Sequence, residues 1–194
     1  MDVIKRLSPN CKPRSVPIKY VILHGTWMDN DDEALNRLCD PVAEVSCHYL
    51  ISREGDIYQL VEENHVAWHA GVSAWGQDEG LNANSIGIEL SHPLPSTMEN
   101  PHYTEIQYQR LEQLLLEILS RHQIFPKNIL AHSDIATDRK DDPGAFFNWQ
   151  RLYDTGLAEA VCGELNPSPE VLRHIGYHGS DEDVMKAYAL RLAK

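Results

Sequence analysis

Short apolar runs at several points along the chain predict the strands of a β-sheet. Residues 18–24 (IKYVILH) form a β-branched run that ends in a histidine, and residues 85–90 (SIGIEL) and 128–133 (NILAHS) form two more. Residues 47–61 (CHYLISREGDIYQLV) hold two strand-like runs around Glu-Gly-Asp, which indicates a hairpin.

Helical spacing is clearest over residues 104–122, where Thr104 and Gln107 are placed as a capping box ahead of an apolar stripe. A shorter helix is predicted over residues 31–39, which begin with three acids. Residues 146–160 fit either a helix or irregular structure. Strands interspersed with helices predict an α/β fold with a mixed central β-sheet flanked by helices.

The character of the sequence changes near the C-terminal end. Ser168 precedes Pro169 as an N-cap precedes the first helical position, and Ser180 is placed to cap a second helix. We therefore expect a main domain over residues 1–160 and a short helical C-terminal tail over residues 161–194.

Composition narrows the class of protein. The chain has 194 residues, 42% of them hydrophobic, which suffices for one folded core. Its formal net charge of −12 argues against a nucleic-acid partner and against attraction to anionic membranes. We expect a monomer.

Signals for export and for disulfides are weak. The N-terminal region carries no apolar segment of a signal peptide and no membrane anchor, so we expect a cytoplasmic protein, or a periplasmic one if a leader has been removed. The four cysteines include no CxxC pair, which favours free thiols in a reducing compartment. A bridge between Cys39 and Cys47 is the alternative.

Two histidines lie at the ends of predicted strands. His24 ends one apolar run and His132 ends another, and strand ends far apart in sequence can meet at one edge of a sheet. Asp142 follows His132 closely enough for a loop to fold it back. Two imidazoles and a carboxylate form the ligand set of a catalytic zinc with a fourth position open. The alternative is three unrelated polar residues.

Two further charged residues are candidates for catalysis. Glu89 interrupts an apolar strand on a face otherwise made of small residues, which makes it a candidate general base or else part of an exposed strand face. Lys140 is either a solvated loop lysine or a group that offsets the charge of an oxyanion.

The segment 63–85 has little periodicity, and a loop of this length in a compact domain is usually functional or mobile. Within it, Trp68 and His69 could line a cleft for a sugar or peptide. Loop packing is the alternative.

An ordered series of motifs over residues 8–157 resembles one known family, the zinc-dependent N-acetylmuramoyl-L-alanine amidases of the AmpD/AmiD type, which are akin to peptidoglycan recognition proteins. The motifs are SPN, YVILHGT, VSCHYLISREGDIYQLV, AWHAGVSAW, LNANSIGIEL and AHSDIATDRKDDPG. The resemblance implies the amidase fold, with zinc in a groove at one face of the sheet.

The resemblance also implies the roles of single residues. Zinc ligands fall on His24, His132 and Asp142, the catalytic glutamate on Glu89, and the oxyanion-stabilising lysine on Lys140. Substrate-binding positions of the family fall on Trp68, His69 and Asn82.

The implied reaction is cleavage of the amide between N-acetylmuramic acid and L-alanine in muropeptides, including 1,6-anhydro forms, in cell-wall recycling or turnover. The alternatives are a non-catalytic peptidoglycan-binding protein on the same fold and a purely structural zinc. Asp142 argues against the first, and the open fourth position argues against the second.

Three departures from the family pattern bear on substrate preference. Gly25 stands where relatives often carry tyrosine. His92-Pro93 stands where Asn-Pro is common, which we expect to alter the groove rim, and Thr137-Asp138 replaces Pro-Gly, so we expect that loop to bend differently. The tail resembles the start of the family's helical peptidoglycan-binding module, and we expect a remnant of it packed on the catalytic domain.

Overall fold

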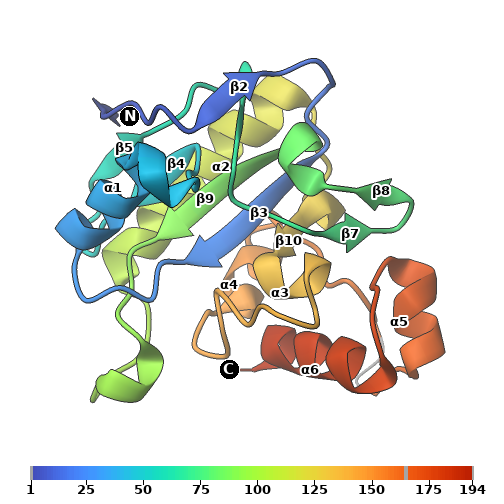
Figure 1. The fold of residues 1–194 in the computed structure, drawn as a ribbon. Coiled ribbons are helices and arrows are strands. Elements are labelled where there is room, and N and C mark those ends of the chain that lie inside the picture. The colour runs from blue at the N-terminus through green and yellow to red at the C-terminus, as the bar shows by residue number, and fades with distance from the viewer. Residues whose placement is uncertain (1, 164–165, 194) are drawn as a thin grey trace.

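The computed structural model describes residues 2–163 and 166–193. Residue 1 of the predicted main domain and residues 164–165 and 194 of the predicted tail lie outside the described residues. Figure 1 shows the chain as a central sheet with helices packed around it.

Six strands of the described chain form the main sheet, in the order β1-β5-β4-β9-β3-β10. Only β4 and β5 pair in antiparallel fashion among these neighbours, so the sheet is mixed, as predicted. The strands are β1 (Ile4–Lys5), β5 (Ile57–Gln59), β4 (Tyr49–Ile51), β9 (Ser85–Leu90), β3 (Tyr20–Gly25) and β10 (Ile129–Ala131).

Alternation along the central strands explains how each face of the sheet is used. In β9, Ile86, Ile88 and Leu90 point into a core that they share with the long helix α2 (Glu105–His122). Residues of β9 with the opposite parity face the other side of the sheet. The predicted capping box at Thr104 is present and starts α2.

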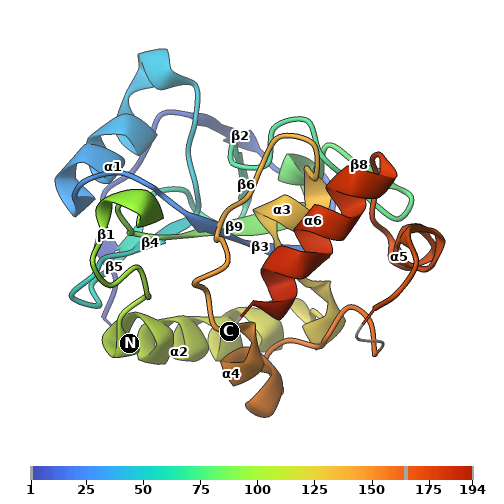
Figure 2. The ribbon, with the colours of Figure 1, turned by 90° about the horizontal axis from the view of Figure 1, so that it is seen from below.

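The other face of the sheet is covered by two separate groups of helices. Helix α1 (Asp31–Cys39) packs over Leu50 of β4. Helices α3 (His132–Ile135), α5 (Pro169–Ile175) and α6 (Asp181–Leu192) gather over Ile22 and Leu130. Figure 2 shows α2 and α4 on one side of the sheet and α1, α3 and α6 on the other.

Two small two-stranded sheets flank the main one. They pair β2 (Cys11–Pro13) with β6 (His65–Ala67), and β7 (Ala74–Trp75) with β8 (Asp78–Glu79). The segment that we expected to be an irregular loop therefore contains short strands. In the ambiguous stretch 146–160, helix α4 (Trp149–Asp154) forms and irregular chain follows it.

The predicted C-terminal tail packs on the main domain. Ser168 and Ser180 cap α5 and α6 as predicted, each accepting a backbone hydrogen bond from its helix. Cys39 and Cys47 are thiols, so the alternative of a disulfide between them is not realised. Within the described ranges, no helix combines the length and the apolar character needed to cross a membrane.

Candidate metal and catalytic site

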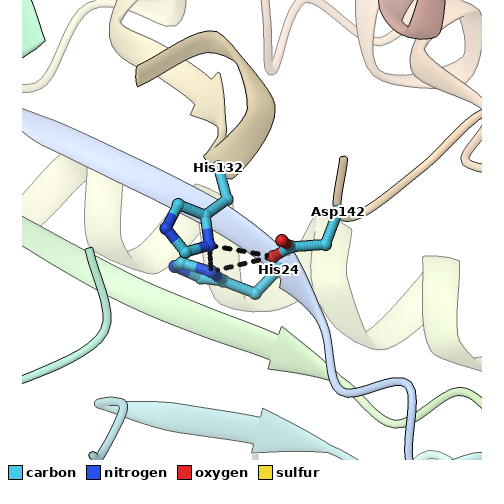
Figure 3. Close-up of side chains that lie close together, drawn as sticks. All are labelled: His24, His132 and Asp142. Carbon is cyan, nitrogen blue, oxygen red and sulfur yellow. Dashed lines mark hydrogen bonds and ion pairs between the residues drawn. The ribbon is translucent and has the colours of Figure 1, made fainter. Parts of the chain in front are cut away.

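Three side chains converge where β3 and β10 end (Figure 3). His24 Nδ1 lies 3.0 Å from His132 Nδ1, and each of these atoms lies 3.1 Å from Asp142 Oδ2. All three residues are buried. They are the set that the sequence predicted as metal ligands.

The strand register explains why the two histidines meet. Parallel strands β3 and β10 place Ala131 opposite Leu23, so the next residue of each chain segment, His132 and His24, adjoins the other. One detail of the prediction is wrong: β10 ends at Ala131, and His132 is the first residue of α3 rather than the end of the strand. The helical turn that starts there directs the His132 side chain back toward β3.

The loop after α3 brings the third ligand. The Ser133 backbone N–H donates to the Asp142 carbonyl at 3.0 Å, which folds the loop back onto the start of the helix. Asp142 is thereby returned to His132, as the ten-residue spacing predicted.

The donor set fits a small divalent cation. Four ligands placed tetrahedrally at about 2.0–2.2 Å from zinc lie about 3.4 Å apart, close to the separations of these three atoms. Burial and the neighbouring His132 lower the pKa of His24 to about 4, so its ring is neutral. Burial raises the pKa of Asp142, but His132 and His24 outweigh it and hold this pKa below its ordinary value. A neutral imidazole and a carboxylate are the protonation states in which these side chains bind metal.

Glu89 lies beside the ligands. It is the register partner of His24 on the neighbouring strand β9, so both side chains project from the same face of the sheet. Its Oε2 atom is closed off from solvent and has no hydrogen-bond partner among the residues that the structure describes. Burial and the charge of Asp142 raise the pKa of Glu89 to about 8, while Lys140 opposes the rise. Such a carboxyl group is suited to exchanging protons.

A cleft of about 340 Å³ opens in front of these residues, and its lining includes residues of α1 and of the loop that follows α3. Lys140 and the predicted substrate-binding residues Trp68 and His69 line it. Asn82 does not line this cleft. Its side-chain oxygen accepts from the backbone N–H groups of His69 and Ala70, at 2.9 and 2.7 Å.

The cleft residues that sequence reasoning missed include Trp27, Arg37 and Arg139. Trp27 adopts a positive φ of 49°, and its buried indole N–H has no hydrogen-bond partner within residues 2–163 and 166–193. The Arg139 guanidinium donates to the carbonyls of Ala70 and Val72, which joins two loops that border the cleft. No local pattern marks Trp27 or Arg37, but Arg139 lies inside the AHSDIATDRKDDPG motif.

Comparison with known proteins identifies the family to which this chain belongs. Residues 14–145 match the family described as N-acetylmuramoyl-L-alanine amidase. The chain is 43% identical over 163 residues to the 1,6-anhydro-N-acetylmuramyl-L-alanine amidase AmpD of Escherichia coli K12, covering 74% of this chain and 85% of that protein.

A second relative is longer than this chain. N-acetylmuramoyl-L-alanine amidase AmiD of Escherichia coli K12 is 40% identical over 151 residues, which cover 72% of this chain and 54% of AmiD. A solved structure of that amidase, in complex with anhydro-N-acetylmuramic acid-L-Ala-D-gamma-Glu-L-Lys, superposes with a TM-score of 0.77 and 32% identity. It covers 95% of this chain and 81% of the solved one.

Proposed function

Because the chain belongs to the N-acetylmuramoyl-L-alanine amidase family, we propose that it hydrolyses the amide bond between N-acetylmuramic acid and L-alanine in muropeptides. The observation that carries this proposal is the convergence of His24, His132 and Asp142 beside a carboxyl group, Glu89, at the floor of a cleft.

We propose zinc as the metal. Imidazole and carboxylate ligands suit it, and three protein ligands leave a fourth position for catalysis. When bound, zinc polarises a carbonyl group and lowers the pKa of water to about 7.

The chain's own residues supply the proton transfers and the charge balance. Glu89 has a pKa of about 8, which falls once a cation sits beside it, so that near neutral pH it can accept a proton from the water that attacks the amide carbonyl. It returns this proton to the amine of L-alanine as the C–N bond breaks. Lys140 lines the same cleft and offsets the negative charge that develops on the amide oxygen. Trp68 and His69 border the space in which the substrate is held, and their contact with it stays a prediction.

The names of the relatives support soluble cell-wall fragments as substrates. AmpD is named for a 1,6-anhydro substrate, and the solved AmiD complex contains an anhydromuropeptide. We infer that this protein also acts on anhydromuropeptides, as a monomer in cell-wall recycling. Its location in the cytoplasm stays a prediction, which fractionation of the producing cells would test.

The decisive experiment is incubation of the zinc-loaded protein with purified muropeptides, read by mass spectrometry. We expect release of free stem peptide, and its loss on chelation and in Asp142→Ala. Intact muropeptide after this incubation would refute the amidase proposal and favour a binding protein on the same fold. Parallel reactions with 1,6-anhydro and reducing-end substrates test the inferred preference.

A further inference from the structure

A chain of three polar groups stands behind the ligand His24, on the side away from the metal site. His24 Nε2 lies 3.0 Å from His69 Nδ1, and His69 Nε2 lies 3.2 Å from the Ser85 hydroxyl. The Ser85 hydroxyl in turn lies 2.6 Å from the Leu81 carbonyl oxygen.

The proton positions in this series of hydrogen bonds can be assigned by starting from the Leu81 carbonyl oxygen. A carbonyl oxygen only accepts, so the single hydroxyl proton of Ser85 is donated to Leu81. Ser85 therefore presents a lone pair to His69, and His69 Nε2 carries the N–H. Within residues 2–163 and 166–193, the polar side chains that contact the His69 ring are those of His24, His48 and Ser85. None of them is a carboxylate, so the ring is neutral.

The assignment then reaches the metal site. With its proton on Nε2, His69 offers Nδ1 as an acceptor, and the His24 Nε2–H donates to it. This leaves the lone pair of His24 Nδ1 directed at His132 and Asp142, where a cation would sit.

The fold makes room for the His69 ring in this one place. A Cβ atom added at Gly87 would lie 2.6 Å from His69 Nδ1 and from Cδ2, closer than such atoms approach, so only glycine leaves space. Gly87 has an ordinary φ, so it is the approach of the ring that requires glycine here. From the other side, Asn82 holds the His69 backbone N–H.

Ala70, the next residue of the same loop, fixes the tautomer of His132, the second proposed histidine ligand. His132 Nε2 lies 3.3 Å from the Ala70 carbonyl oxygen, which can only accept, so Nε2 carries the proton and Nδ1 faces the metal site. Arg139 also donates to this carbonyl and holds it in position.

We propose that His69 is a positioning residue that fixes the tautomer and orientation of His24, and that residues 69 and 70 of the WHAG motif together set both histidine ligands. The inference rests on the proposed metal site. It assigns His69 a task behind the ligand, where hydrogen-bond partners of metal-bound histidines typically contribute 10–100-fold to metal affinity.

Zinc affinity, measured by competition with a chromophoric chelator, tests this role without any substrate. We expect His69→Phe, which keeps the ring shape but removes the acceptor, to bind zinc 10–100-fold more weakly. We expect His69→Asn to stay within a few-fold of the parent, because its amide oxygen can take the place of Nδ1. His174→Phe, at an exposed position of α5, is the matched control and should leave affinity unchanged.

Two further measurements separate positioning from folding. Thermal unfolding of the metal-free variants shows whether His69→Phe and His69→Asn are equally folded. Long-range 1H–15N spectra of the zinc-loaded parent report the tautomers directly, and we expect protonated Nε2 on His24, His69 and His132.

The proposal is overturned if His69→Phe binds zinc like the parent, if His69→Asn binds as weakly as an equally stable His69→Phe, or if His69 carries its proton on Nδ1. A parent protein that binds zinc with these tautomers but leaves muropeptides intact would refute the amidase function and leave the positioning role standing.

Discussion

Replacement of Arg191 by methionine tests whether the C-terminal tail is part of the amidase core. Arg191 lies in α6 and is 3% exposed, and its guanidinium forms an ion pair with Asp134 of α3, which is 0% exposed. It also donates to the Tyr153 hydroxyl at 2.9 Å and lies 3.9 Å above the Trp149 ring. The tail therefore reaches into the main domain through a buried cation.

The expected loss in free energy of unfolding follows from the buried Asp134 carboxylate that Arg191→Met leaves without a counter-charge. Without Arg191, the Asp134 carboxylate keeps the Tyr177 hydroxyl at 2.7 Å and the Ala131 N–H at 2.7 Å but loses its counter-charge. Removing one partner of a buried ion pair typically costs about 3–5 kcal/mol in free energy of unfolding. Arg173→Met is the control, because the Arg173–Asp181 pair of the same tail is exposed and such pairs contribute at most about 1 kcal/mol.

Urea unfolding at pH 7, followed by circular dichroism, measures both variants. We expect one cooperative transition for the parent and a loss for Arg191→Met several times larger than for Arg173→Met. The double variant with Asp134→Asn should lose less than the sum of the two single changes. Equal losses for Arg191→Met and Arg173→Met, or a separate early transition of the tail, would show that the tail is an independent module.

Two other predictions concern the site, and a third concerns Glu63, which bonds to the end of α2. Glu89→Gln should retain zinc but lose roughly 10²–10⁴-fold in kcat, measured with metal content determined on the same samples, whereas unchanged turnover would remove Glu89 from the proton transfers. Gly87→Ala should force the His69 ring from its seat, lowering the free energy of unfolding by about 1–3 kcal/mol and weakening zinc binding; a variant equal to the parent in both would contradict the close approach. Burial raises the pKa of Glu63, but hydrogen bonds from Arg121, His122 and Tyr49 outweigh it and hold this pKa at about 2, below the ordinary 4.5, so its stabilisation is present above pH 4.5 and is lost as the pH falls toward 2. Glu63→Gln should therefore reduce stability by about 2 kcal/mol at pH 7 and hardly at all near pH 2 in urea titrations, and an equal loss at both pH values would refute the assignment.

The convergence of the three proposed metal ligands could be predicted from sequence because local patterns place them. Apolar runs mark the strands, and His24 and His132 follow those runs at the edge where parallel strands end. Glu89 was equally visible, since its parity in β9 puts it on the face opposite the apolar core.

The hydrogen-bonding roles of the WHAG loop, residues 68–71, could not be predicted from local sequence patterns. Sequence reasoning placed His69 and Asn82 at the substrate. The structure finds that His69 lines the cleft and is also bonded to His24, and that Asn82 is bonded to the loop backbone. Which nitrogen of a histidine carries the proton depends on partners such as Ser85, and those partners are brought together only by the tertiary fold.

A contact with the C-terminal tail explains the presence of Thr137, one of the departures from the family pattern. The Thr137 hydroxyl donates to the His178 carbonyl in the turn before α6, and it lies 2.5 Å from where a Cβ of Gly179 would be. Farther along the same loop, Asp141 forms an ion pair with Lys186 of α6 at 2.6 Å. The sequence predicted that the loop at Thr137-Asp138 bends differently from that of the family. It could not predict that this loop contacts the tail some forty residues farther along the chain, because that contact forms only in the tertiary fold.

These contacts tie the tail to the catalytic loop as well as to the core. The loop between Thr137 and Asp142 carries the lysine expected to face the oxyanion and the third proposed metal ligand, and it is attached to the tail at Thr137 and at Asp141. Asp134, two residues after His132, is attached to the tail through Arg191. Because His132 and Asp142 both lie beside residues held by the tail, loosening the tail should shift two of the three ligands together. Arg191→Met is therefore expected to weaken zinc binding in the folded protein, and zinc affinity equal to that of the parent would limit the tail to a role in stability.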